Sequence, residues 1–272
     1  MRQLVLQSGP GGDGRIVLSG GDYRYLAQVL RLKEGASVDA RLPDGSLARC
    51  RVDSLDARAR RVALVVEVSP RAISREKGMP GRNVSPPSSL PESFPRIVLF
   101  QWLLKGPKMD TVVRQATEMG VVSIVPVMGE RCVASEGSPG RLERWERVIR
   151  EARQQSGSPL ATGIGPITKS SEVPEFWARQ RAAGRPLAFV MTEAPLALKT
   201  LHGYLESGAD TVAVAVGPEG GMSASEIDML VAAGFMPVHF ATNVLRAETC
   251  ALYAVAAVQN ALLEYESWHR NA

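Results

Sequence analysis

Residues 212–248 read VAVAVGPEGGMSASEIDMLVAAGFMPVHFATNVLRAE, and the organisation of the chain can be worked outward from them. The first five, residues 212–216, are all apolar, which is typical of a strand buried on both faces of a parallel sheet. The turn that follows, residues 217–221, contains three glycines, which can adopt positive φ and expose backbone N–H groups. The stretch therefore begins as a buried strand that ends in an open turn.

A helix and a second strand follow this turn. Ser223 and Glu226 have the spacing of a capping box, and Gly234 supplies the stop of the helix. A short strand at residues 236–241 then leads into the loop at residues 242–248. Loops that follow strands of one parallel sheet emerge at the same edge, where α/β folds bind their ligands. Both loops can therefore contact one bound molecule, although the glycines alone are equally consistent with a simple tight turn.

Upstream of this stretch, from residue 97, strands alternate with helices, which indicates a parallel sheet covered on both faces. We expect strands at residues 97–103, 121–128 and 187–191. We expect helices at residues 141–155, 172–183 and 196–206, and another that begins after Lys108. The predicted fold class is α/β.

The first 69 residues have a different pattern. Short β-rich runs occur at residues 3–7, 15–18, 37–42, 47–54 and 61–68. One helix, at residues 22–32, interrupts them, with Leu26, Val29 and Leu30 on its inner face. These runs predict a small β-barrel. Six prolines and several serines in residues 70–96 then predict a linker, which we expect to be mobile at residues 72–93.

Composition and short motifs indicate a globular protein and argue against several classes of protein. A chain of 272 residues that is 45% hydrophobic can build a real core. Cys50, Cys132 and Cys250 are far apart, which predicts reduced thiols and no structural zinc. The chain lacks a signal-peptide core and any apolar run of ~20 residues, so we expect a soluble, cytoplasmic protein that contacts no membrane. Its three histidines lack metal or triad spacing, and no motif of a hydrolase, dehydrogenase or nucleotidase occurs.

The formal net charge of +4 is unevenly distributed. Residues 1–96 contain 16 Lys/Arg and 10 Asp/Glu, a net charge of +6, whereas residues 97–272 carry −2. Attraction to a polyanion such as RNA would therefore come from the first third of the chain. A solvated basic face is the alternative, and charge alone favours that alternative.

Motifs in the second half resemble a known family. The Gly-Pro-Glu-Gly-Gly turn and the Leu-Arg-Ala-Glu-Thr sequence at residues 245–249 resemble the carboxyl-terminal signature of SPOUT methyltransferases. The chain is most similar to the RsmE family, which methylates N3 of a uridine in 16S ribosomal RNA. Further matching patches are residues 26–32, Gly35, residues 44–45, Lys105 and residues 116–121, 130–132 and 154–157. The chain departs from the family at Tyr25, Ser158, Ala241 and Asn243, where members usually have histidine, arginine, glycine and a basic residue.

The resemblance implies an architecture and partners. It implies a SPOUT-type parallel sheet with a carboxyl-terminal trefoil knot, preceded by a PUA-like RNA-binding β-barrel. The corresponding divisions are a barrel at residues 1–69, a linker at residues 70–96 and a methyltransferase domain at residues 97–272. It also implies S-adenosyl-L-methionine as the cofactor, 16S ribosomal RNA in the small subunit as the substrate, and a homodimer.

Methyl transfer from a sulfonium needs mainly positioning, and a glycine-lined backbone can approach an adenosyl group closely. The residues expected to bind the cofactor are Gly217, Pro218, Glu219, Gly220, Gly221, Asn243, Val244, Leu245 and Arg246, to which the similarity to the family adds Thr192 and Glu193. Because uracil N3 carries a proton at neutral pH, the enzyme must remove it or stabilise the anion. Arg246 is the candidate for anion stabilisation, and Glu219 and Glu248 are candidates for the base. The residues expected to bind RNA are Arg2, Tyr25, Arg31, Lys105, Arg131, Gln155 and Ser156.

Two alternatives remain open at this point. One is a SPOUT enzyme that modifies another RNA position, and the other is a ribosome-binding factor that has kept the fold but lost catalysis. Cofactor binding separates the second alternative from an enzyme. The departures at Ser158 and Asn243 leave the manner of RNA binding open.

Overall fold

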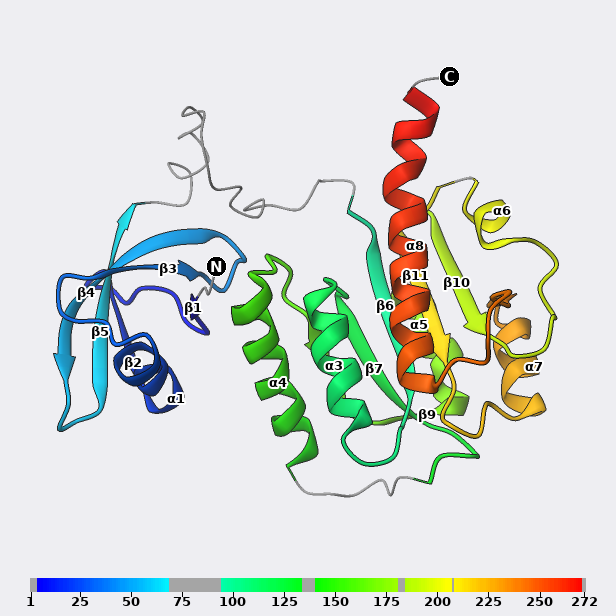
Figure 1. Cartoon of the computed structure of the whole chain (residues 1–272), viewed down its shortest axis with the longest axis horizontal. Coiled ribbons are helices and arrows are strands. Elements are labelled where there is room, and N and C mark those ends of the chain that lie inside the picture. Colours follow the sequence, from blue (N-terminus) through cyan, green and yellow to red (C-terminus); the bar gives the residue numbers. More distant parts are fainter. Residues whose placement is uncertain (1–3, 69–93, 134–139, 181–183, 207, 271–272) are drawn as a thin grey trace. The chain divides into compact units, whose positions relative to one another are not determined.

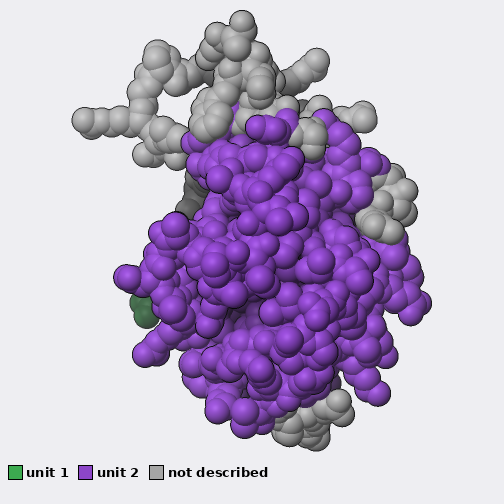
Figure 2. Space-filling model, turned by 90° about the vertical axis from the view of Figure 1, so that its right-hand side faces the viewer, with its two compact units in different colours: residues 1–90, 153–159 green, residues 91–152, 160–272 purple. Residues whose placement is uncertain are grey.

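The computed structural model describes residues 4–68, 94–133, 140–180, 184–206 and 208–270 (Figure 1). The chain divides into two compact units, which Figure 2 distinguishes by colour. Unit 1 comprises residues 1–90 and 153–159, and unit 2 comprises residues 91–152 and 160–272. Most of the predicted linker, residues 70–93, lies outside the described residues.

Unit 1 contains a five-stranded sheet with the order β1-β3-β4-β5-β2. Its strands are β1 (Leu4–Val5), β2 (Arg15–Ser19), β3 (Ser37–Arg41), β4 (Leu47–Asp56) and β5 (Arg61–Val68). β1 pairs with β3 in parallel, and the other pairs are antiparallel. Ala48, Cys50 and Val52 alternate along β4 and are all fully buried, as expected for a strand with one face in a core. The strands thus occur where alternation predicts them.

The helix predicted at residues 22–32 is present but extends over residues 20–29 and has two parts. An α-helix, α1 (Gly20–Arg24), continues as a π-helix, η1 (Tyr25–Val29), in which the Leu30 amide donates to the Tyr25 carbonyl at 2.8 Å. The wider π turn changes which residues share a face. Leu26 is fully buried as predicted and Leu30 is half-buried, but Val29 is 56% exposed, so its inner-face position is corrected.

Unit 2 contains a seven-stranded parallel sheet with the order β12-β10-β11-β6-β7-β8, in which β9 also pairs with β7. The strands are β6 (Arg96–Trp102), β7 (Ser123–Met128), β8 (Gly163–Ile164), β9 (Thr168–Lys169), β10 (Pro186–Met191), β11 (Thr211–Val216) and β12 (Met236–Val238). The helices are α3 (Lys108–Glu118), α4 (Arg141–Ser156), η2 (Ser170–Glu172), α5 (Val173–Gln180), α6 (Leu201–Leu205), α7 (Ala224–Ala232) and α8 (Ala247–Arg270).

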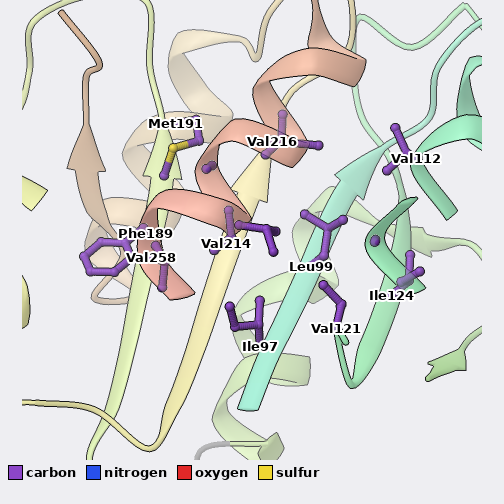
Figure 3. Packing of buried hydrophobic residues seen from close by; sticks show 14 of the residues in the cluster. Ile97, Leu99, Val112, Val121, Ile124, Phe189, Met191, Val214, Val216 and Val258 are labelled. Atoms are coloured by element: carbon purple, nitrogen blue, oxygen red, sulfur yellow. The ribbon is translucent and has the colours of Figure 1, made fainter. Parts of the chain in front are cut away.

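Both faces of this sheet are covered by helices. Leu99 and Val214 point into one cluster, which α3 and α8 complete with residues such as Val112 and Val258 (Figure 3). Phe100 points to the opposite face, into a second cluster to which α5 and α7 contribute. All six residues of β11 are buried, which explains its unbroken apolar sequence. Each fully buried large side chain contributes roughly 1.5–3 kcal/mol, so these clusters supply most of the stabilisation of unit 2.

Two element boundaries differ from the prediction. The helix expected at residues 196–206 begins only at Leu201, because the Thr200 hydroxyl accepts a hydrogen bond from the Gly203 amide and caps it. The Tyr204 hydroxyl accepts from the Leu198 amide at 3.0 Å, which holds the preceding residues outside the helix. The strand expected at residues 236–241 ends at Val238. Its last residues are therefore part of the loop at the sheet edge.

A buried carboxylate joins the elements at this edge. Glu226, in the first turn of α7, is 3% exposed and forms the predicted capping box with Ser223. Its Oε1 accepts hydrogen bonds from the Trp102 indole at 2.9 Å and from the Glu130 amide at 3.2 Å. A Cβ added to Gly129 would lie 2.4 Å from the same oxygen, so this position requires glycine. One side chain thus holds the ends of β6 and β7 against α7.

The ionised form of Glu226 is the one that this network stabilises. Burial opposes ionisation, but the hydrogen bonds from Trp102, Ser223 and Glu130 outweigh it and hold the pKa of Glu226 below its usual value. A carboxyl group whose pKa is lower in the folded state stabilises the fold above its unfolded pKa, and this contribution disappears as the pH falls through the folded value.

We therefore predict that Glu226→Gln lowers the free energy of unfolding by about 2–3 kcal/mol at pH 7, because the amide cannot accept all of these hydrogen bonds. The difference from the unmodified protein should shrink as the pH falls below about 4.5. Urea unfolding at several pH values measures both effects. Glu175→Gln, which removes an exposed i,i+4 ion pair with Arg179, is the control and should cost less than about 0.5 kcal/mol. An equal decrease in the free energy of unfolding in Glu226→Gln and Glu175→Gln would contradict the prediction.

Candidate functional site

Three loops meet at the carboxyl edge of the unit 2 sheet and enclose a cavity of about 550 Å³. They follow β10, β11 and β12, and the last of them leads into α8. These three strands are neighbours, in the order β12-β10-β11, so their carboxyl ends lie together. A cavity of this size at this edge is typical of a small-molecule or cofactor site in an α/β fold.

The structure brings all of the predicted cofactor residues together. Thr192 and Glu193 lie in the loop after β10, the glycine turn follows β11, and Asn243 to Arg246 precede α8; all eleven line the cavity. Sequence reasoning did not assign the other lining residues to the cofactor site, although it predicted an RNA contact for Arg131; they are Lys108, Arg131, Met191, Ala194, Val216, Met222, Ile227, Val238, His239, Phe240, Thr242, Ala247 and Cys250. Several of them are the last residue of a predicted strand or lie directly after one. This position at the carboxyl end of a parallel strand is a signal that could have identified them. Lys108 and Arg131 come from distant elements, and only the fold places them here.

The glycines of the turn have different local roles. Gly221 has φ +70° and its amide donates to the Pro218 carbonyl at 2.9 Å, so its conformation favours glycine. A Cβ on Gly217 would lie 3.1 Å from the backbone nitrogen of Met222, which leaves little space. A Cβ on Gly220 would meet nothing closer than 3.8 Å, from Arg131. Gly220 is therefore the position where a side chain can enter the cavity without straining the turn.

A charged cluster forms one wall of the cavity. The Lys108 Nζ lies 2.9 Å from Glu219 Oε1 and 3.8 Å from Glu248 Oε2. The Lys105 amide also donates to Glu219 Oε1, at 3.1 Å. Burial raises the pKa of Glu219, but these hydrogen bonds and the charge of Lys108 outweigh burial and hold it below its usual value. Glu219 is therefore a fixed, ionised carboxylate.

The three candidate catalytic residues occupy different positions. Arg246 is exposed and lines the cavity. Glu219 lines it as well, but its carboxylate is paired with Lys108. Glu248 lies in the first turn of α8, outside the cavity lining, and its Oε2 is buried without a hydrogen-bond partner. Arg246 is thus an exposed cation among the residues that line the cavity.

The residues predicted to bind RNA are divided between the two units. In unit 2, Lys105 is exposed and Arg131 lines the cavity, where its guanidinium donates to the Gly220 carbonyl at 3.1 Å. The others belong to unit 1 and do not line the cavity: Tyr25 is half-buried at the start of η1, Arg31 and Gln155 are exposed, and Ser156 is half-buried. Arg2 lies outside the described residues.

The departures from the family pattern also have definite positions. Ser158 is 7% exposed, and its amide donates to the Ser156 hydroxyl at 3.2 Å, so it does not offer an exposed side chain. Ala241 and Asn243 are exposed in the loop after β12, and Asn243 lines the cavity. Asn243, where the resemblance predicts a basic residue, thus lines the cavity with an uncharged side chain.

Two further cavity residues have defined chemistry. The His239 Nδ1 lies 3.2 Å from the Thr192 carbonyl, which can only accept, so this nitrogen carries the proton. Burial raises the pKa of the Cys250 thiol to about 11, which keeps it protonated and unreactive near neutral pH. Among the described residues, no group of three or more His, Cys, Asp or Glu could hold a metal ion. Within the same residues, no helix has the length and apolar character needed to span a membrane.

Family models match both units. A model described as an RNA methyltransferase domain matches residues 91–259, and one described as an RNA methyltransferase PUA domain matches residues 18–59. A protein of Synechocystis sp. named ribosomal RNA small subunit methyltransferase E is 29% identical over 255 residues, which cover 93% of this chain and 75% of the relative. A protein of the same name from Aquifex aeolicus is 34% identical over 167 residues, which cover 60% of this chain and 68% of that protein.

A solved structure shares the fold. The crystal structure of a ribosomal RNA small subunit methyltransferase E from Neisseria gonorrhoeae, bound to S-adenosyl methionine, is 24% identical to this chain. The two structures superpose with a TM-score of 0.75, and the matched region covers 96% of this chain and 97% of the Neisseria chain. With a family model over most of unit 2 and a relative that is 34% identical, this chain belongs to the ribosomal RNA small subunit methyltransferase E family of RNA methyltransferases.

Proposed function

We propose that this protein transfers a methyl group from S-adenosyl-L-methionine to N3 of a uridine in 16S ribosomal RNA of the small ribosomal subunit. The observation that carries the proposal is the convergence of eleven separately predicted residues, from three loops, on one cavity. The names of its relatives, which refer to the small-subunit ribosomal RNA, support the choice of substrate. Such an enzyme acts in the cytoplasm, where ribosomes are assembled.

The cavity suits an adenosyl cofactor. Met222 and Ile227 provide apolar surface for the adenine, and the backbone around Gly220 is open to contact. The loop from Asn243 to Arg246 contributes a second set of backbone groups to the cavity lining. A glycine turn together with apolar side chains can select adenosine by shape and backbone hydrogen bonds.

The sulfonium of the cofactor supplies an activated methyl group, so the protein mainly has to position the two reactants. N3 of the uracil would give up its proton to water or to a carboxylate and form the new N–CH₃ bond, while the bond between the methyl group and the sulfonium sulfur breaks and leaves a neutral thioether. Arg246, exposed at the cavity, stabilises the negative charge that develops on the uracil. This role requires a fixed positive charge rather than proton transfer, which suits a guanidinium.

RNA binding in the proposal uses both units. Lys105 and Arg131 lie on the cofactor-binding unit, and Arg2, Tyr25, Arg31, Gln155 and Ser156 lie on the PUA-related unit. The excess of positive charge in residues 1–96 supports phosphate contacts there. The proposal also includes a PUA-like β-barrel for the five-stranded unit and a trefoil knot at the carboxyl-terminal end of the SPOUT-type unit.

The proposal includes a homodimer built partly on α8. Most apolar residues of this helix, such as Val255 and Val258, are buried within its own chain. Tyr253, Ala256 and Leu263 are nevertheless exposed, at spacings of three and seven residues that place them on one face, where Asn260 is the exposed polar residue between the last two. A second copy of α8 can cover this stripe.

Gly220→Val should lower the affinity for S-adenosyl-L-methionine by more than about 100-fold, because its side chain projects into the cavity. Calorimetric titration of both proteins measures the effect, and thermal unfolding should show a fold that is nearly as stable. The matched control is Gly165→Val, a glycine with equally open surroundings outside this cavity. A folded, unmodified protein that does not bind the cofactor would exclude the methyltransferase.

The substrate position is tested in cells. Ribosomal RNA from cells that lack this protein should lose one N3-methyluridine in 16S RNA, and expression of the unmodified protein should restore it. Arg246→Lys keeps a positive charge but loses the planar guanidinium, so it should restore the methyl group only partly. Mapping by mass spectrometry of RNA fragments measures both results. Loss of a methyl group at another position would support the alternative SPOUT enzyme instead.

The dimer is tested by sedimentation velocity at micromolar concentration. We expect the unmodified protein to sediment as a dimer and Ala256→Glu to shift it toward monomer, since a glutamate would place a charge in the apolar stripe. Val231→Glu is the control, because Val231 is also an exposed apolar residue but lies on α7. A monomeric unmodified protein would rule out the dimer.

A further inference from the structure

Lys108 connects three segments of the cavity wall. It begins α3, and its Nζ reaches Glu219 in the turn after β11 at 2.9 Å. The same nitrogen lies 3.8 Å from Glu248, in the first turn of α8. The turn after β11 and the start of α8 are the two segments that carry most of the proposed cofactor contacts. One cation therefore sets the spacing between them.

Glu219 extends this connection to the loop before α3. Its Oε1 accepts a hydrogen bond from the Lys105 amide at 3.1 Å, in addition to the bond from Lys108. This contact uses the backbone of Lys105, so the side chain of Lys105 stays exposed. The carboxylate is thus held from two directions, and its rotation toward the reacting atoms would break both bonds.

In this cluster one ammonium, that of Lys108, faces the two carboxylates of Glu219 and Glu248. The side chains of Lys108, Glu219 and Glu248 are only 33%, 26% and 19% exposed, so water screens their interaction incompletely. Glu248 Oε2 is buried and, among the residues that the structure describes, it has no hydrogen-bond partner; Lys108, at 3.8 Å, is the cation with which it forms an ion pair there. Removal of the ammonium would leave two partly buried carboxylates that repel each other. The arrangement of both loops would then change.

We propose that Lys108 and Glu219 are positioning residues, which hold the two cofactor loops at the spacing required for binding and take no part in proton removal. The inference rests on the proposed function, because it concerns the same cavity. It replaces the hypothesis that Glu219 is a base: a carboxylate that accepts two hydrogen bonds and pairs with Lys108 is a poor acceptor for the N3 proton.

Titration calorimetry with S-adenosyl-L-methionine and steady-state kinetics on small ribosomal subunits test the proposal. Lys108→Met should raise the Kd and the KM for the cofactor by about tenfold and change kcat less than about threefold. Lys108→Arg should restore most of the affinity, since it can bridge the same carboxylates. The Glu219→Gln variant should raise the Kd by about fivefold and leave the pH dependence of kcat unchanged.

A double-mutant cycle shows whether the two residues act through each other. The Lys108→Met/Glu219→Gln double variant should have about the same Kd for the cofactor as the single variant with the higher Kd. If the two residues acted independently, the fold increases in Kd of the two single variants would multiply. Arg179→Met, which removes an exposed ion pair with Glu175 in the same unit, controls for loss of surface charge and should not change the Kd.

The outcomes separate the two proposals. If the unmodified, folded protein does not bind the cofactor, the proposed function fails. If it binds and Lys108→Met binds equally well, the positioning role fails while the proposed function stands. A loss of kcat above about 100-fold in Glu219→Gln, with an altered pH profile, would overturn the inference and make Glu219 a catalytic base.

Discussion

The buried carboxylate of Glu226 is the constraint on which the rest of the site depends. An ionised group inside a protein is costly unless it accepts several hydrogen bonds, and Glu226 accepts from the side chains of Trp102 and Ser170 and from the backbone amides of Glu130 and Ser223. Its donors come from the end of β6, the loop after β7, η2 and the start of α7. Because these segments are far apart in sequence, this single group fixes the edge of the sheet where the cavity opens.

At that edge, contacts hold the glycine turn at residues 217–221 from two sides. The Glu226 network holds Glu130 in place, and the next residue, Arg131, donates to the carbonyl of Gly220 in the glycine turn. On the other side of the turn, Lys108 and Glu219 connect it to α3 and α8. The turn itself has little side-chain packing of its own, so its conformation is determined from both sides. A methyltransferase of this family needs that rigidity, because its catalysis relies chiefly on the relative position of two reactants.

The sequence predicted the elements well wherever one local rule applied. The apolar run of β11, the capping box at Ser223 and the order of strands and helices all appear as expected. The predictions failed where a contact from elsewhere decided the outcome. Val29 turns outward because of a π turn, and α6 starts late because Tyr204 and Thr200 hold the residues before it. The cavity residues of the three loops were identifiable from motifs, whereas Lys108 could not be, since its partners are more than a hundred residues away.

A crystal structure of the full chain with S-adenosyl-L-homocysteine tests this account most directly. The account predicts that the adenosyl group lies in the cavity between the turn at residues 217–221 and the loop at residues 243–246, with hydrogen bonds chiefly to backbone atoms. It also predicts that the ion pair between Lys108 and Glu219 persists in the complex. A ligand bound outside this cavity, or a Glu219 carboxylate released from Lys108 and directed at the thioether sulfur, would contradict it.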